Sequence, residues 1–221
     1  MKSKQEVLTI LRNKILFLEM LPGSPVIDIQ IAQELDVSRT PVREALLALQ
    51  KERLIDIYPQ RGTFVSLLDL KFLEEAAYVR HVVERDVLMG LAMRRMELGA
   101  EIERCLDLQE LTAKSHDVKE YVLNDIAFHQ ALFKFAGHEQ AWTIIESQFR
   151  HVIRFQMLYL SNSDSLFEKS LDEHRIILQC IANGDMDRLD AILRLHHDCV
   201  RQNKVMVSKT YSKYCVKGTG F

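Results

Sequence analysis

The sequence predicts a mainly α-helical protein, with an N-terminal winged helix-turn-helix followed by an all-α antiparallel helical bundle. Three observations predict this fold. Apolar residues recur at spacings of three and four along most of the 221 residues, as they do on the buried face of a helix. Eight glycines and four prolines are few, which argues against a many-turned β-sandwich. Only residues 54–65 alternate in the manner of two strands around a turn.

Composition and charge exclude several classes of protein. The chain is 48% hydrophobic and 27% charged, which is ordinary for a folded protein. Its net charge of −2 means that any contact with nucleic acid must come from a local basic patch. No run approaches the ~18 apolar residues of a membrane span, and charges interrupt any signal-peptide core. The four cysteines form no CxxC pair, so we expect reduced thiols, a cytoplasmic location and no membrane.

The first domain, residues 1–66, carries its signals in the order of a winged helix-turn-helix. Asp28 and Ser38 are residue types that cap helix N-termini. Pro41 falls in the first turn of the third helix, where a missing N–H costs little. The expected elements are helices over 4–19, 28–35 and 38–53, and strands over 54–58 and 63–65.

The second domain, residues 67–207, is predicted to be helical throughout. Gly99, Gly137 and Gly184 punctuate the apolar periodicity, as glycines do where helices end. Six long helices with short loops predict an antiparallel bundle. The tail, residues 208–221, has a weak pattern, so we expect it to be poorly held. The expected helices cover 69–97, 99–114, 117–136, 139–160, 164–182 and 185–207.

The start of the third helix has the features of a DNA recognition helix. Its first turn presents Arg39, Thr40 and Arg43 away from its apolar stripe, and arginine can donate two parallel hydrogen bonds to guanine. Hydroxyl groups and free backbone N–H groups at a helix start suit a phosphate. The alternative is a set of surface arginines that contact another protein. The candidate DNA-binding residues, with two from the turn between the strands, are Ser38, Arg39, Thr40, Arg43, Arg61 and Gly62.

Four side chains of the bundle form a candidate metal site. Asp125 and His129 are four residues apart and share one helix face, and His174 and His196 lie on two further helices. Such nitrogen and oxygen ligands suit Zn²⁺, Ni²⁺ or Mn²⁺. Each histidine could instead be an ordinary solvated or hydrogen-bonded side chain. A second alternative is a metal-dependent helical phosphohydrolase, for which the His197-Asp198 pair would supply ligands.

Residues 7–65 resemble the DNA-binding domain of GntR-type bacterial regulators. The resemblance rests on the run Val-Ser-Arg-Thr-Pro-Val-Arg-Glu-Ala-Leu over 37–46 and on Arg-Gly-Thr-Phe-Val over 61–65. It implies that Arg39 and Arg43 touch bases and that Gly62 lies at the groove. One departure is Arg53, where the family usually has a glycine.

Residues 70–205 resemble the FCD ligand-binding domain of the FadR-like subfamily, in its shorter, six-helix VanR-like form. The pattern Asp-x-x-Phe-His matches residues 125–129, and later histidines match His174 and His196. The resemblance implies that these four ligands bind a metal that helps to hold a small organic acid as effector. Arg80, in the family's Arg-x-x-x-Glu pattern with Glu84, would pair with the effector carboxylate. The two could instead form an ordinary surface ion pair.

Together these features predict a ligand-responsive transcription regulator and not an enzyme. We expect it to repress transcription by binding double-stranded operator DNA. Because a two-fold symmetric protein matches a two-fold symmetric site, we expect a homodimer on a palindromic operator.

Overall fold

The computed structural model describes residues 2–217, which fall into two compact units. One unit comprises the chain up to Leu70 together with the segment from Ser208 onward, and the other comprises Lys71–Val207. Among the described residues, no helix combines the length and the apolar character that crossing a membrane requires.

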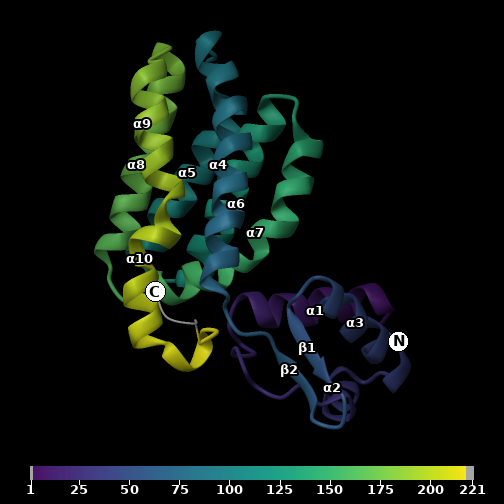
Figure 1. The fold of residues 1–221 in the computed structure, drawn as a ribbon. Helices are drawn as coiled ribbons and strands as arrows, with labels where there is room; N and C mark the ends of the chain where they lie inside the picture. Colours follow the sequence, from purple (N-terminus) through teal and green to yellow (C-terminus); the bar gives the residue numbers. More distant parts are fainter. Residues whose placement is uncertain (1, 218–221) are drawn as a thin grey trace. The chain divides into compact units, whose positions relative to one another are not determined.

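The N-terminal unit is a winged helix-turn-helix (Figure 1). Helix α1 packs against α3, and α3 also packs against α2 and β1. The two strands are antiparallel, with Ile55 opposite Val65 and Tyr58 opposite Gly62. The predicted order of elements is confirmed, and its bounds are α1 Lys4–Leu16, α2 Asp28–Leu35, α3 Arg39–Lys51, β1 Ile55–Tyr58 and β2 Gly62–Val65.

The residues at the helix N-termini show which predicted caps form in this unit. Ser3 and Glu6 form a reciprocal capping box at the start of α1. The expectation that Asp28 caps α2 is wrong: Ile27 is the N-cap and Asp28 is the first helical residue, so its carboxylate does not bond the helix's own N–H groups. Ser38 is the N-cap of α3, but its side chain makes no capping hydrogen bond.

The turn after α3 shows why a glycine would fit there. Arg53 has φ +57°, in the left-handed region that glycine adopts at no steric cost. The Leu54 N–H donates to the Leu49 carbonyl at 2.9 Å and closes this turn. The arginine therefore takes a glycine-like conformation without changing the fold.

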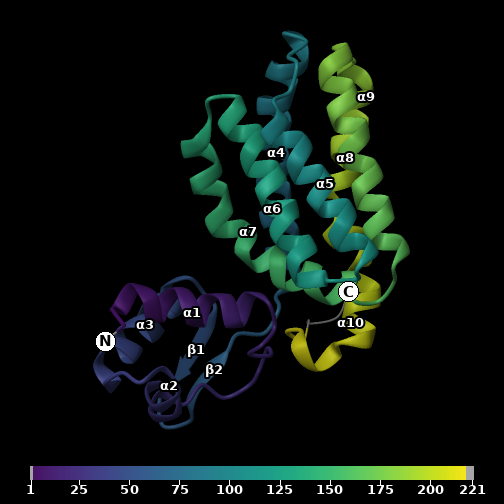
Figure 2. The same ribbon diagram turned by 180° about the vertical axis from the view of Figure 1, so that it is seen from behind.

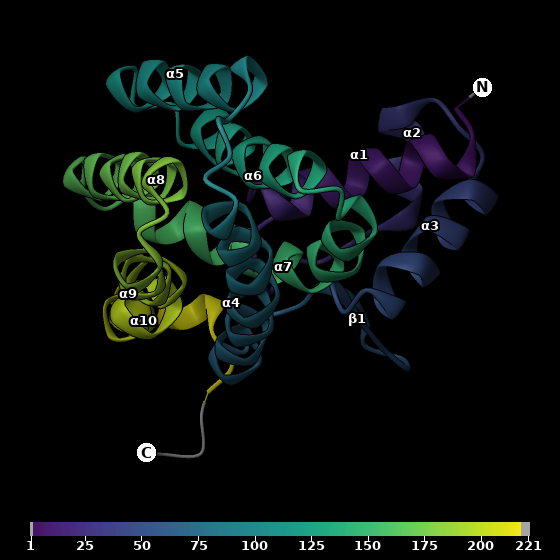
Figure 3. The same ribbon diagram turned by 90° about the horizontal axis from the view of Figure 1, so that it is seen from above.

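The second unit is an antiparallel helical bundle, seen from behind in Figure 2 and from above in Figure 3. Helix α6 packs against α5 and α7, and α8 packs against α5 and α9. Fully buried Leu88, Phe128, Leu132, Ile177 and Leu193 contribute to its core. The helices are α4 Leu70–Met93, α5 Ala100–Lys114, α6 Val118–Phe135, α7 Glu139–Leu160, α8 Ser165–Asn183, α9 Met186–His197 and α10 Cys199–Thr210.

The last expected helix, over 185–207, is two helices. Helix α9 ends at His197 and α10 begins at Cys199, so seven α-helices follow the wing within residues 2–217 instead of six. At this break the Gln202 side chain donates to the Leu195 carbonyl at 3.0 Å. A side-chain amide thus bonds a backbone carbonyl at the break between α9 and α10. The spacing of apolar residues does not reveal such a break.

The segment after α10 is better held than its sequence predicts. Residues Ser212–Tyr214 form a 3₁₀ helix, and Leu68 pairs with Cys215 as in a parallel sheet. The Leu68 N–H donates to the Tyr214 carbonyl at 2.8 Å, and the Val216 N–H donates to the Leu68 carbonyl at 2.9 Å. The remainder of the expected tail, residues 218–221, lies outside the described residues.

Gly184, which ends α8, gives a stability prediction. It has φ +69°, and an added Cβ would lie 3.0 Å from Arg95 Cγ and 3.2 Å from the Ala92 carbonyl oxygen. Gly184→Ala is expected to lower the free energy of unfolding by about 1–2 kcal/mol, because an L-residue is strained in this region. Gly137→Ala is the control, since its φ of +76° is similar but its Cβ would meet nothing within 4 Å. Thermal melts with EDTA present should show the larger loss for Gly184→Ala, and equal losses would contradict the steric argument.

Candidate functional site

The four predicted metal ligands meet inside the bundle. Asp125 and His129 lie on α6, His174 lies on α8 and His196 on α9. One potential ligand atom from each lies within 4.8 Å of those of the others. The first three residues are buried, and the side chain of His196 is 8% exposed. Helices far apart in the sequence thus supply one compact set of nitrogen and oxygen donors.

The Nε2 atoms of the three histidines face the centre of this cluster. His174 Nε2 lies 3.4 Å from Asp125 Oδ1, and His196 Nε2 lies 3.2 Å from His129 Nε2. Two ligands that share one zinc ion at about 2.0–2.1 Å would be separated by similar distances. Among the described residues, the buried His174 Nε2 has no hydrogen-bond partner. A buried polar atom without a partner is costly, so this donor set fits an additional bound group.

The opposite ring nitrogens are held by partners outside the cluster. His129 Nδ1 donates to Glu84, His174 Nδ1 donates to Gln109 Oε1 at 2.8 Å, and His196 Nδ1 donates to Glu173 Oε2 at 2.9 Å. Each acceptor is an oxygen without a proton, so Nδ1 must carry the hydrogen. A neutral ring held in this way keeps the lone pair of its Nε2, which is the arrangement that metal-binding histidines use.

Burial keeps the central histidines neutral. It lowers the pKa of His129, with a further contribution from the nearby Arg80 charge. It holds the pKa of His174 well below its usual range, aided by the neighbouring His196 and His129. Because a metal binds only the unprotonated imidazole, both rings are ready for ligation at neutral pH.

Glu84 on α4 joins this cluster to Arg80. It is fully buried, and one oxygen accepts from Arg80 Nε at 2.9 Å and from His197 Nε2 at 3.0 Å. Burial raises the pKa of its carboxyl group, but the Arg80 charge and the hydrogen bond from His129 outweigh burial and hold that pKa well below its usual range. The Arg80–Glu84 pair is therefore a buried ion pair and not the surface pair considered as an alternative.

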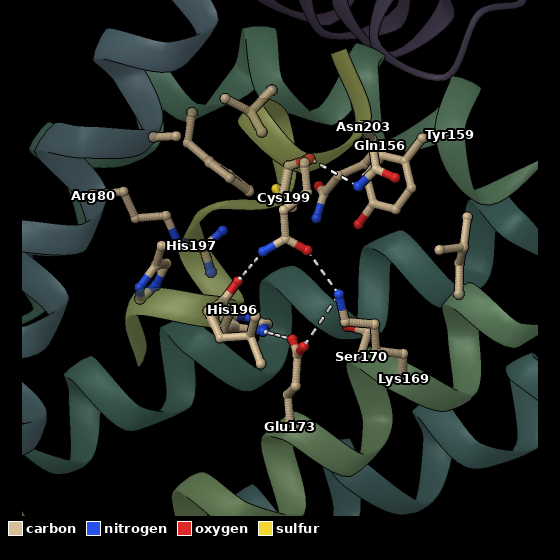
Figure 4. Close-up of a pocket in the computed structure, with 16 residues that line it drawn as sticks. Arg80, Gln156, Tyr159, Lys169, Ser170, Glu173, His196, His197, Cys199 and Asn203 are labelled. Carbon is tan, nitrogen blue, oxygen red and sulfur yellow. Dashed lines mark hydrogen bonds and ion pairs between the residues drawn. The ribbon is translucent and has the colours of Figure 1, made fainter. Parts of the chain in front are cut away.

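A cavity of about 40 Å³ lies next to the cluster (Figure 4). Arg80, Lys169, Glu173 and His196 are among the residues that line it, so His196 belongs to both the cluster and the cavity wall. The Arg80 guanidinium stacks on Phe149 with its Cζ 4.0 Å from the ring centroid. Among the described residues, its buried Nη2 has no hydrogen-bond partner.

His197 lines the same cavity but lies apart from the metal-ligand set. Its Nε2 is engaged by Glu84, and its Nδ1 lies 3.3 Å from His81 Nδ1. Burial lowers the pKa of His197 to about 3. The structure thus groups His196, and not its neighbour, with the other three ligands.

The candidate DNA-binding residues are all exposed in the winged unit. Four of them lie at the start of α3: Ser38, Arg39, Thr40 and Arg43. The apolar face of this helix, which includes Val42, is buried. Because Ser38 makes no capping bond, the first N–H groups of α3 stay available. Arg61 lies in the turn between β1 and β2, and Gly62 is the first residue of β2.

Comparison with known proteins decides the family. The model of the bacterial regulatory proteins of the gntR family matches residues 3–65, and the FCD domain model matches residues 75–198. The chain belongs to the GntR family. It is a DNA-binding transcription regulator with a C-terminal FCD domain of the FadR-like kind.

Individual relatives agree with this assignment. An uncharacterised HTH-type transcriptional regulator of Streptomyces ambofaciens is 31% identical over 88% of this chain and 81% of its own length. The HTH-type transcriptional repressor RspR of Escherichia coli is 28% identical over 87% of this chain and 84% of its own. A crystal structure of a GntR regulator from Rhodococcus sp. RHA1 is 26% identical, with a TM-score of 0.73 over 90% of this chain and 96% of its own. These proteins are regulators and not enzymes, so the phosphohydrolase alternative is set aside.

Sequence reasoning missed three residues of the FCD domain site. Glu173 precedes His174 and Glu84 pairs with Arg80, so both stood beside residues already singled out. Gln109, fully buried on α5, had no signal in the sequence. The three share one role, which is to accept a hydrogen bond from the Nδ1 atom of a cluster histidine.

Proposed function

We propose that this GntR regulator represses transcription and that a small carboxylate effector controls it through a divalent metal in the FCD domain. Asp125, His129, His174 and His196 would hold the metal. The observation that carries the proposal is the unpartnered Nε2 of His174, in a cluster whose outward Nδ1 atoms all donate to other residues. Three imidazoles and one carboxylate suit Zn²⁺, Ni²⁺ or Mn²⁺.

The charges beside the cavity favour an anionic effector. Arg80 is balanced by Glu84, and Lys169 lies 3.8 Å from Glu173. A divalent ion with Asp125 as its only carboxylate ligand would leave one excess positive charge. An effector carboxylate would neutralise that charge and accept from Arg80 Nη2. A cavity of about 40 Å³ favours a molecule of few atoms.

The winged unit would read the operator. Arg39 and Arg43 would contact bases in the major groove, Ser38 and Thr40 a phosphate, and Arg61 and Gly62 the flanking backbone or minor groove. Two copies on a palindromic site would place two recognition helices in successive grooves. Effector binding would change their spacing, and by linkage operator binding would change effector affinity by the same factor.

Native mass spectrometry of protein purified without chelator tests this function. A dimer that carries one metal ion per subunit, with or without the mass of a small acid, would support it. A chain that stays metal-free after addition of Zn²⁺, Ni²⁺ and Mn²⁺ would contradict the metal site, and a monomer that remains monomeric on DNA would contradict the palindromic operator.

Arg80→Ala gives a prediction for the effector. Metal-loaded protein should bind acetate or lactate roughly 10–100-fold more weakly after this change, because a hydrogen bond to a charged group is worth roughly 1.5–3 kcal/mol. Calorimetric titration with each acid would measure the loss. Arg85→Ala is the matched control, since Arg85 is on the same helix but pairs with Asp190 at the surface. Equal effects in both variants would remove Arg80 from the effector site.

A further inference from the structure

The carboxylate of Asp28 holds two arginines of the recognition helix. Arg39 Nη2 donates to Asp28 Oδ1 at 3.1 Å and to Oδ2 at 2.9 Å, and Arg43 Nε donates to Oδ2 at 2.9 Å. The side chain of Asp28 is 22% exposed, whereas those of Arg39 and Arg43 are 48% and 62% exposed. Hydrogen bonds from Arg39 and Arg43 lower the pKa of Asp28, so it stays ionised at neutral pH. A charged group on α2 thus holds two arginine side chains of the recognition helix.

The donor atoms that bind Asp28 determine which N–H groups of each arginine remain for contacts with bases. Arg43 is held through Nε, so its two Nη atoms are not used in the hydrogen bond to Asp28. Those two atoms can donate two parallel hydrogen bonds to O6 and N7 of guanine. Arg39 is held through one Nη and keeps its other N–H groups. The contact with Asp28 therefore orients the guanidinium groups and leaves the atoms that read bases available.

We propose that Asp28 is a positioning residue that sets the base specificity of this regulator by orienting Arg43 and Arg39. The inference rests on the proposed base contacts of those arginines. Two physical effects act in opposite directions. A carboxylate near DNA repels phosphates, which weakens binding to every sequence. An arginine that is already oriented loses less freedom on contacting a guanine and reaches other base edges less easily. Asp28 therefore lowers overall affinity and raises the preference for the operator.

A competing model makes a different prediction. If Asp28 only occupied the arginines until DNA displaced it, its removal would strengthen binding to all duplexes by the same factor. The ratio of affinities for operator and non-operator DNA would then be unchanged. The ratio, and not the affinity, separates the two models.

The experiment uses the full-length protein and duplexes selected by the wild-type protein from a random 24-base-pair library. Fluorescence anisotropy compares the selected duplex with a shuffled duplex of the same composition for wild type, Asp28→Asn and Glu34→Gln. Glu34→Gln is the charge-matched control, because Glu34 is also on α2 but pairs with Lys14. Asp28→Asn should bind the shuffled duplex more tightly and lower the affinity ratio by about tenfold. Glu34→Gln should change both affinities equally.

Double variants complete the test. In an Arg39→Ala, Arg43→Ala background, Asp28→Asn should no longer change the affinity ratio, because its effect is transmitted through those arginines. An unchanged or higher ratio for Asp28→Asn alone, with wild-type circular dichroism, would overturn the inference. If Arg39→Ala, Arg43→Ala itself retains the wild-type ratio, the proposed base contacts are wrong, and that result is distinguishable from failure of the Asp28 inference alone.

Discussion

His174→Ala is expected to abolish binding of the proposed divalent metal. The affinity should fall by more than about 100-fold, because losing only a partner outside the ligand set typically costs about 10–100-fold. His174 Nε2 faces the cluster centre and has no hydrogen-bond partner among the described residues, so its removal would delete a proposed ligand and leave the Gln109 amide oxygen without its donor. Metal content after gel filtration, measured by inductively coupled plasma mass spectrometry, and competition with a chromophoric chelator would report the loss.

Thermal melts with and without EDTA separate metal loss from misfolding. Wild-type protein should melt at a lower temperature in EDTA, because a ligand that binds only the folded state stabilises it. His174→Ala should show no such difference, whereas His116→Ala, at an exposed surface ion pair with Asp164, should behave like wild type. Full metal content in the His174 variant would contradict the proposed ligand set.

Arg43→Ala is expected to remove most of the preference for the operator. A bidentate arginine–guanine contact gives roughly 1–3 kcal/mol of discrimination per half-site, and a dimer would lose it twice. Anisotropy titrations with the selected and shuffled duplexes should show a large loss on the former and a small one on the latter.

Lys51→Ala is the control for charge. Lys51 is exposed in the last turn of the same helix, away from the turn that carries Arg43. Its removal should weaken binding to both duplexes equally and leave their ratio unchanged. A wild-type ratio for Arg43→Ala would remove this residue from base recognition.

Local sequence was sufficient to predict the order of helices and strands in the winged unit. Its helices and strands are short and adjacent in the chain, and their start and stop signals lie within a few residues of each element. The same signals misplaced the cap of α2, because Ile27 and Asp28 differ by one position and the carboxylate of Asp28 turns towards Arg39 and Arg43. A helix cap depends on neighbours in the sequence, but the best partner of a charged side chain can be on another helix.

In the bundle, periodicity predicted most helices but not the bend at Asp198. The apolar spacing continues through 185–207, while the break depends on backbone and side-chain bonds around Leu195 and Gln202.

The pairing of Leu68 with Cys215 joins residues far apart in the chain, and so no local pattern indicates it.

The sequence by itself determined the family, the winged domain followed by a helical bundle, and the residue types that can bind DNA and metal. These properties depend on local spacing and on motifs read along the chain. Only the tertiary structure decided that Glu84, Gln109 and Glu173 hold the Nδ1 atoms of three histidines, and that Asp28 holds two arginines of the recognition helix. Hydrogen bonds of this kind form over about 3 Å between side chains on different helices. Their partners are therefore set by how the helices pack, and not by distance along the sequence.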